Sequence, residues 1–324
     1  MRRRDFFTLL GGAVAAWPFA AQAQQLMPLI GMLEAGPPNS WDFTGFRQGL
    51  KDAGYLESQN LAIEYRWADG NENRLREMAA ELVQRKIAVI VTLGSAPAAS
   101  AAMGATSSIP IVFGYGGDPI KLDHVKSINK PGGNVTGMTS LSGELAGKQL
   151  GILRELLPQA ERFGFLDNPR SVTYAHRLKD SQIAANVAGL TVEVLLAASG
   201  VEIDRIFANL EEKRMHGLIV GPNPIFFAQR SQIVQAAARS AIPAIYPFRE
   251  YVQAGGLMRY GPSLSERDRE VGHYVGRILK GEKPGDLPVV QSVKFELVLN
   301  AKTAKALHLV IPNSMQLLAD EVIE

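Results

Sequence analysis

Residues 109–119 have the sequence IPIVFGYGGDP, and residues 242–251, further along the chain, have the sequence IPAIYPFREY. Each stretch begins with an Ile-Pro pair, continues as a short apolar run and ends in a loop-like segment. Apolar runs bounded by turn-forming residues are typical of buried strands. The two stretches therefore predict equivalent strands in two parts of the chain.

A second pair of stretches has the same spacing. Residues 30–33 (IGML) resemble residues 163–166 (FGFL), and this offset of 133 positions is also the offset between Ile109 and Ile242. A shared offset at separated places indicates an internal repeat. We therefore expect two similar lobes.

Strand-like and helical runs alternate along the first half of the repeat. The expected strands are 28–35, 60–68, 87–95 and 109–115, and the expected helices are 41–55, 73–86 and 96–108. This alternation predicts an α/β fold with parallel sheets. Ligands of such sheets bind beyond the carboxyl ends of the strands, so two facing lobes would enclose a cleft.

The first 23 residues are expected to be an export signal and not part of the fold. A basic start (MRRRDFF) precedes a short apolar stretch, and Ala21-Gln22-Ala23 fits a cleavage site. The adjacent arginines are typical of twin-arginine export, with an ordinary secretory signal as the alternative. No later stretch is apolar for long enough to cross a membrane. A periplasmic protein without a membrane anchor is expected.

Composition excludes several classes of function. The chain has no cysteine, which excludes disulfides, thiol catalysis, thiolate metal sites and lipoprotein anchoring. Removal of residues 1–23 leaves 31 basic and 31 acidic residues. This balance argues against a nucleic-acid surface, which needs a basic excess.

No catalytic or cofactor motif is found in the sequence. A dinucleotide fingerprint at the glycine-rich loop would need a glycine where Pro119 stands, and neither a phosphate loop nor a nucleophile elbow occurs. The five histidines have no spacing typical of metal ligands. We therefore expect neither a cofactor nor a bound metal, and no enzymatic activity.

Residues in the loops at the carboxyl ends of the strands are the candidates for ligand binding. Ser95 and Ala96 stand at a helix start and suit a carboxylate. Aromatic rings could hold a flat or apolar solute, and amide and hydroxyl groups could form neutral hydrogen bonds. The complete set of candidates is Glu34, Ser95, Ala96, Tyr115, Gly117, Asp118, Asn168, Ser171, Asn223, Tyr246 and Phe248.

Structural roles are the alternatives for several of these candidates. Asp118 before Pro119 is typical of a helix cap. Tyr115, Tyr246 and Phe248 follow strands and could simply pack at the strand ends. The asparagines stand beside prolines in turn-like sequences, and Glu34, a possible partner of an amine, could equally be a solvated loop acid.

Three segments resemble a known family. Residues 46–70 (FRQGLKDAGYLESQNLAIEYRWADG), 109–137 (IPIVFGYGGDPIKLDHVKSINKPGGNVTG) and 294–312 (KFELVLNAKTAKALHLVIP) resemble bacterial substrate-binding proteins of ABC importers. Members of this group are often described as tryptophan/tyrosine transport binding proteins. The resemblance extends over nearly all of the chain after the signal, although the loop GYGGDP differs from that of other members.

The resemblance implies a type I periplasmic-binding-protein fold, with two Rossmann-like lobes joined by three crossover segments. The lobes would comprise residues 27–139 plus 262–288 and residues 140–259 plus 290–324. They would close by a hinge motion in the crossovers, near residues 137–141, 258–263 and 286–293. Each lobe would thus be built from two separate segments, and the segments of the two lobes alternate along the chain.

We therefore expect a monomeric receptor that binds a small solute between its lobes and passes it to an ABC permease. The solute is expected to be aromatic or amphipathic and carboxylated. One alternative is an exported α/β enzyme, which twin-arginine export would suit. Another is a sensor component that delivers its closed form to a signalling receptor.

Overall fold

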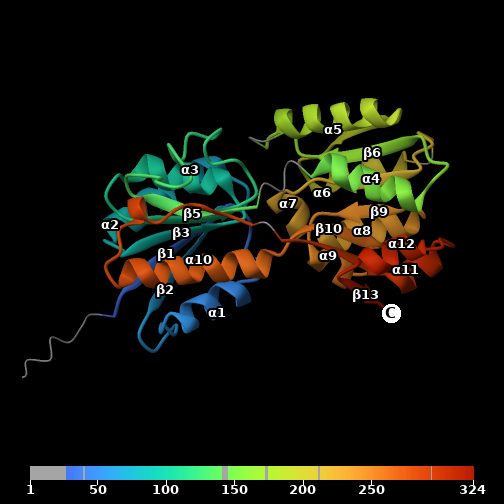
Figure 1. The fold of residues 1–324 in the computed structure, drawn as a ribbon. Helices are drawn as coiled ribbons and strands as arrows, with labels where there is room; N and C mark the ends of the chain where they lie inside the picture. Colours follow the sequence, from blue (N-terminus) through green and yellow to red (C-terminus); the bar gives the residue numbers. More distant parts are fainter. Residues whose placement is uncertain (1–26, 39–40, 141–144, 172–173, 211, 293) are drawn as a thin grey trace, which may run out of the picture.

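The computed structural model describes residues 27–38, 41–140, 145–171, 174–210, 212–292 and 294–324. The export signal expected at residues 1–23 lies outside these ranges. The described chain forms two lobes, each with a central sheet covered by helices on both faces (Figure 1). This arrangement confirms the predicted α/β class.

The first lobe contains a six-stranded sheet in the order β11-β5-β4-β3-β1-β2, and all of its pairings are parallel. Its strands are β1 (Leu29–Glu34), β2 (Ala62–Trp67), β3 (Val89–Leu93), β4 (Ile111–Tyr115), β5 (Val135–Thr139) and β11 (Val290–Gln291). Its helices are α1 (Thr44–Asp52), α2 (Glu72–Gln84), α3 (Ala96–Ala105), α10 (Leu264–Leu279) and the short 3₁₀ helix η2 (Pro284–Asp286). Every residue of β3 and β4 is buried, as expected for parallel strands covered on both faces.

The second lobe contains a seven-stranded sheet in the order β13-β12-β10-β9-β8-β6-β7. Its strands are β6 (Arg162–Asp167), β7 (Thr191–Leu196), β8 (Gly217–Val220), β9 (Ala244–Tyr246), β10 (Met258–Pro262), β12 (Phe295–Asn300) and β13 (Glu321–Ile323). Its helices are α4 (Ala146–Leu156), α5 (Tyr174–Ala188), α6 (Gly200–Ala208), α7 (Pro224–Ala228), α8 (Arg230–Arg239), α9 (Arg249–Gln253), α11 (Ala301–Ala306) and α12 (Asn313–Leu318). Only β12 runs antiparallel to its neighbour β10 in the described sheet.

The two sheets have equivalent strand orders, which confirms the internal repeat. The order β2-β1-β3-β4-β5 in the first lobe corresponds to β7-β6-β8-β9-β10 in the second. The matching stretches 30–33 and 163–166 form β1 and β6, and the two Ile-Pro stretches lead into β4 and β9. The lobes therefore differ mainly in the elements added after β10.

Three segments connect the lobes, and their positions correct the predicted boundaries. Pro262, assigned to the first lobe from the sequence, pairs with Phe295 in the second sheet. Residues 290–291, assigned to the second lobe, pair with Met138 and Thr139 at the edge of the first sheet. The second and third connections are therefore shorter than predicted, because backbone pairing continues the sheets into the segments assigned to them.

Helix α10 returns to the first lobe and packs closely on α1. A Cβ atom added at Gly45 or Gly49 would collide with the backbone of α10 at Ser265 or Arg269, and one added at Gly272 would collide with the backbone of α1 at Phe46. Helices can approach this closely only where a side chain is missing. The glycines therefore fix α10, and with it the residues of its first turn, relative to the sheet.

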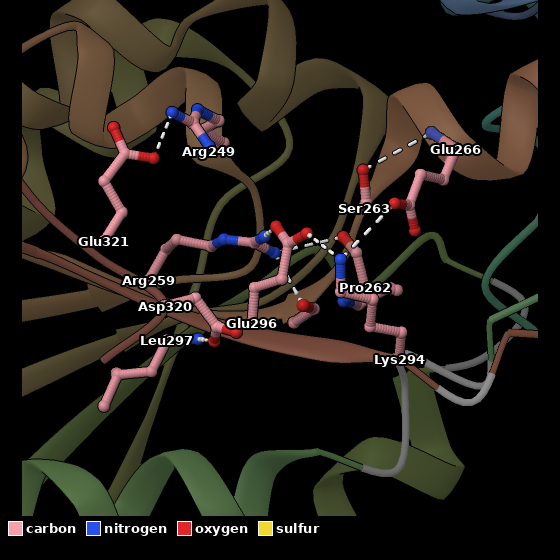
Figure 2. A network of polar contacts seen from close by, with 11 residues as sticks. Arg249, Arg259, Pro262, Ser263, Glu266, Lys294, Glu296, Leu297, Asp320 and Glu321 are labelled. Atoms are coloured by element: carbon pink, nitrogen blue, oxygen red, sulfur yellow. Dashed lines mark hydrogen bonds and ion pairs between the residues drawn. The ribbon is translucent and has the colours of Figure 1, made fainter. Parts of the chain in front are cut away.

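A buried arginine supports the connection from β10 to α10 (Figure 2). The side chain of Arg259 is 1% exposed and pairs through Nη2 with Glu296. Its Nη1 donates to the carbonyl oxygens of Gly261 and Pro262, at 2.6 and 3.1 Å. The guanidinium thus holds the last residues of β10 in place, directly before the chain crosses to the first lobe.

Lys294, which stands just before β12, links this part of the chain to the start of α10. Its Nζ lies 3.5 Å from Glu266 of α10 and 3.6 Å from Glu296 of β12. Ser263 begins α10, and its Oγ accepts a hydrogen bond from the backbone N–H of Glu266 at 3.3 Å. Figure 2 shows these groups gathered where the two connections meet.

Replacement of Arg259 by methionine should lower the free energy of unfolding by about 3–5 kcal/mol, because it removes the buried partner of Glu296 and the donor to two buried carbonyl oxygens. Urea denaturation at pH 7 measures this loss. The matched control is Arg249→Met, which breaks a half-exposed pair with Glu321 and should cost less than about 1 kcal/mol. Equal losses for the two variants would contradict the supporting role of Arg259.

Candidate ligand-binding site

A cavity of about 860 Å³ lies between the two lobes, at the carboxyl ends of their parallel strands. Its wall combines the loops after β1, β2, β3 and β4 of the first lobe with those after β6, β7, β8 and β9 of the second. These are corresponding loops of the two repeats, on the edge where the sequence predicted a cleft. The volume is in the range of sites for small organic molecules.

Helices α2, α3 and α6 are among those that begin in the cavity wall. Asn71, Ser95 and Ser199 cap α2, α3 and α6, and each side chain accepts a hydrogen bond from a backbone N–H in the first turn. The first N–H groups of a helix have no partners within it, and the helix dipole makes this end positive. The helix starts therefore make this wall favourable for negatively charged groups.

Most of the candidates from the sequence lie in this wall. They are Ser95, Ala96, Tyr115, Gly117, Asn168, Ser171, Asn223 and Phe248. Asn168 and Asn223 come from different loops and meet through their side-chain amides, with Nδ2 of Asn168 3.4 Å from Oδ1 of Asn223. Their contact with a ligand stays a prediction, as it does for the whole set.

Glu34 lies behind the wall, outside the described residues that line the cavity. Its side chain is buried, and Oε1 accepts a hydrogen bond from the backbone N–H of Leu93 at 3.0 Å. Burial raises the pKa of Glu34 well above its ordinary value, and the hydrogen bond from Leu93 only partly opposes this. The burial of Glu34 corrects the alternative of a solvated loop acid, and its contact with an amine stays a prediction.

Asp118 and Tyr246 also lie outside the described lining. Asp118 accepts hydrogen bonds from the backbone N–H groups of Ile120 and Lys121, and it organises a turn where the sequence suggested a helix start. Tyr246 stacks on Tyr251 inside the second lobe, with ring centres 4.9 Å apart. Its ring cannot reach the cavity because the neighbouring helix and loop enclose it, so Phe248 alone of this pair lines the cavity.

Trp41 and Arg267 line the cavity and were not among the sequence candidates. Nε1 of Trp41 donates to Oδ2 of Asp268 at 2.8 Å. Its ring also meets Phe227 of the second lobe, with ring centres 5.0 Å apart, so the lobes are in contact here. Trp41 follows a loop that the sequence placed at the cleft, but Arg267 lies on a helix more than 200 residues later, where no local signal points to the site.

Two glycines make room for these side chains. A Cβ atom at Gly94 would collide with the Trp41 ring, and Gly94 also has a φ of +70°, which favours glycine. A Cβ at Gly114 would lie 2.9 Å from Val271 and 3.3 Å from Nε of Arg267. The glycine at 114 therefore leaves space for α10 and its arginine.

Comparison with known families identifies the class of protein. A family model for ABC transporter substrate binding proteins matches residues 35–323. The chain belongs to this family. The family is one of solute-binding proteins, and the resemblance seen in the sequence is confirmed.

Relatives of this substrate-binding protein include several of known structure. It is 27% identical over 265 residues to a tyrosine-binding protein of Clostridioides difficile (strain R20291), covering 82% of this chain and 76% of that protein. The structure of the ABC domain in complex with L-Trp from Streptococcus pneumoniae matches with a TM-score of 0.82 at 27% identity, covering 91% of this chain and 99% of that chain. A conserved domain protein from Vibrio cholerae matches with the same TM-score and coverage at 25% identity.

More distant structures share the fold alone. An ABC transporter solute binding protein from Bacillus halodurans with bound myo-inositol is 12% identical, with a TM-score of 0.62 over 87% of this chain and 98% of that chain. The type I periplasmic-binding-protein fold is thereby confirmed. Within the described residues, no helix is long and apolar enough to span a bilayer, and no group of three or more acidic or histidine side chains could hold a metal.

The second lobe of the substrate-binding protein contributes a buried ion pair to the wall. Arg177 of α5 lines the cavity and pairs with Asp167 at the end of β6, with Nε donating to Oδ2 at 3.0 Å. Burial raises the pKa of Asp167, and the contacts with Arg177 oppose that rise. Because both charges are paired, this corner of the wall is polar but close to neutral.

A chain of hydrogen bonds supports Tyr115 from behind. Its hydroxyl lies 2.6 Å from Nδ1 of His124, and Nε2 of His124 lies 2.7 Å from Oγ of Ser100. Ser100 donates its hydrogen to the carbonyl oxygen of Ala96, so it accepts from Nε2, and Tyr115 donates to Nδ1. His124 therefore acts as a neutral imidazole between the wall and α3.

Replacement of His124 by alanine should lower the free energy of unfolding by about 1–3 kcal/mol at pH 8, because the buried hydroxyl of Tyr115 loses its acceptor. Burial lowers the pKa of His124 below its ordinary value of 6.5. Below pH 6.5 the unfolded chain therefore binds more protons at this position than the folded chain, and the contribution of His124 to stability falls as the pH falls.

Denaturation of the wild type and of His124→Ala between pH 8 and pH 5 tests this. The difference between the two proteins should narrow below pH 6.5. A difference that stays constant over the whole range would contradict the role assigned to the neutral imidazole.

Proposed function

We propose that this protein is the periplasmic receptor of an ABC importer and binds a small aromatic or amphipathic solute with a carboxylate group between its lobes. The observation that carries the proposal is the cavity itself. Its wall holds the rings of Trp41, Tyr115 and Phe248 together with the starts of three helices. An apolar ring system would pack against these aromatic side chains, and an anionic group would face the helix starts.

The relatives favour aromatic amino acids as the first compounds to test. One relative is named a tyrosine-binding protein, and another was solved in complex with L-Trp. Acidic side chains also lie in the cavity wall, at Asp69 and Glu72. They could attract the amino group of such a ligand while the helix starts attract its carboxylate.

Transport would follow from closure of the lobes around the ligand. A solute that contacts both lobes favours their closed arrangement, because the open form offers only half of its contacts. The three connections, two of which meet near Lys294, are the natural place for this hinge. A monomer exported through the signal at residues 1–23 would then deliver its ligand to the permease.

A binding screen tests the proposed function. L-tryptophan, L-tyrosine and related aromatic acids should raise the unfolding temperature of the purified protein, since a ligand that binds only the folded state stabilises it. Sugars such as myo-inositol serve as negative controls. If no aromatic acid shifts the transition and titration calorimetry detects no binding, the proposed ligand class is wrong.

A paired substitution tests the site. Phe248→Leu should weaken binding of the best aromatic acid about tenfold, because the stacking of rings contributes about 0.5–1.5 kcal/mol beyond burial. The matched control is Phe295→Leu, which alters a ring of the second lobe stacked on Tyr260 and outside the described cavity lining. Equal effects of the two substitutions on affinity would contradict the placement of the ligand beside Phe248.

A further inference from the structure

Arg267 is a buried cation held in one orientation in the cavity wall. It stands in the first turn of α10, and its side chain is 2% exposed. Nε and Nη2 donate to Oδ1 of Asp268, at 2.9 and 2.6 Å. The guanidinium carbon lies 5.4 Å from the centre of the Trp41 ring. Contacts on both its edge and its face therefore fix the group.

Arg267 has one nitrogen, Nη1, that its contacts with Asp268 leave unused. Its Nη1 forms no hydrogen bond with any of the described residues, whereas the other two nitrogens are paired. The residue lines the cavity. Nη1 carries two N–H groups, and donors of a buried cation need an acceptor. A ligand oxygen in the cavity would supply it.

The start of α3 lies at the same place. Gly94 directly follows β3, and Gly114 lies near the end of the neighbouring strand β4. The backbone N–H of Gly94 donates a hydrogen bond of 2.7 Å to the carbonyl oxygen of Gly114. The Trp41 ring covers Gly94, directly before the cap residue Ser95, and Nε of Arg267 lies over Gly114. Pro97 has no N–H and Ala98 donates its N–H to Ser95, so the guanidinium and the first residue of α3, Ala96, border one end of the cavity.

The charged groups around this end of the cavity are compatible with a bound anion. Asp268 balances the charge of Arg267, and its other oxygen is bound by Trp41. Glu34, Asp42 and Glu250 are the other acidic groups that interact with Arg267 or Asp268. Burial raises the pKa of Glu34 and of Glu250, which favours their neutral carboxyls, and Asp42 is exposed. A ligand carboxylate would therefore meet two sources of positive potential, Arg267 and the start of α3.

We propose that Arg267 binds the carboxylate of the solute, that the start of α3 completes this anion site, and that Asp268 positions the guanidinium. The proposal rests on the proposed function and assigns a residue to the acidic part of its ligand. Hydrogen bonds between a guanidinium and a carboxylate are among the stronger ones in proteins. The site would select aromatic acids over uncharged compounds of the same shape.

The wild-type protein by itself can test the assignment. Titration calorimetry with L-tryptophan and L-tryptophanamide compares two compounds that share the ring and the amino group but differ in the carboxylate. The acid should bind about 10–100-fold more tightly, the range expected for charge-assisted hydrogen bonds. Equal affinities would overturn the carboxylate site and leave the proposed function standing. Failure of both to bind, with no other aromatic acid bound, would overturn the proposed function and this assignment with it.

Variants then identify the residue. Arg267→Gln should remove most of the preference for the acid while leaving affinity for the amide within about threefold of the wild type. Asp268→Asn should reduce the same preference, which a purely structural role would not alter. Arg249→Gln, in the half-exposed pair with Glu321, is the control and should keep the full preference.

A further variant covers the case in which Arg267→Gln does not fold. Arg267→Lys keeps the charge but lacks the planar set of donors, so it should lower the ratio of acid to amide affinity without abolishing it. Folding of each variant is checked by circular dichroism and thermal unfolding. A folded Arg267 variant with the wild-type ratio would overturn the proposal.

Discussion

The contact between α10 and α1 is the constraint on which the first lobe depends. Glycines on both helices remove the side chains that would separate them, so the two backbones touch. Helix α10 belongs to a late segment of the chain, yet this contact fixes it against a sheet built from the first 140 residues. The chain must therefore cross between the lobes more than once, and the first turn of α10 reaches the end of β4.

The cavity follows from the repeat. Two sheets of equivalent strand order face each other with their carboxyl edges, so the loops after corresponding strands meet across one space. Helices start in several of these loops because most of the parallel strands are followed by a helix that returns along the sheet. The same architecture that buries the strands thus collects unpaired N–H groups at the ligand-facing edge.

The two lobes contribute different chemistry to this wall. In the first lobe, Trp41, Arg267 and Asp268 form a network in which the ring, the cation and the carboxylate hold one another. In the second lobe, Arg177 is paired on two nitrogens with Asp167. The two arginines differ because Arg267 is bonded through one carboxylate oxygen only, and its Nη1 forms no hydrogen bond to the described residues.

The sequence by itself determined the alternation of strands and helices, the repeat and the sheet edge that carries the cavity, because these depend on local patterns and on the general behaviour of parallel sheets. Most of the residues that it singled out for the site, Ser95 and Phe248 among them, lie in the wall of the cavity. Only the tertiary structure decided which side chains face the cavity. Glu34 and Tyr246 are the last residues of β1 and β9, and both side chains are buried, whereas Phe248 lies beyond β9 and lines the cavity. Arg267 stands far away in sequence, and it reaches the site only because α10 packs on α1, a contact between distant segments that no local pattern encodes.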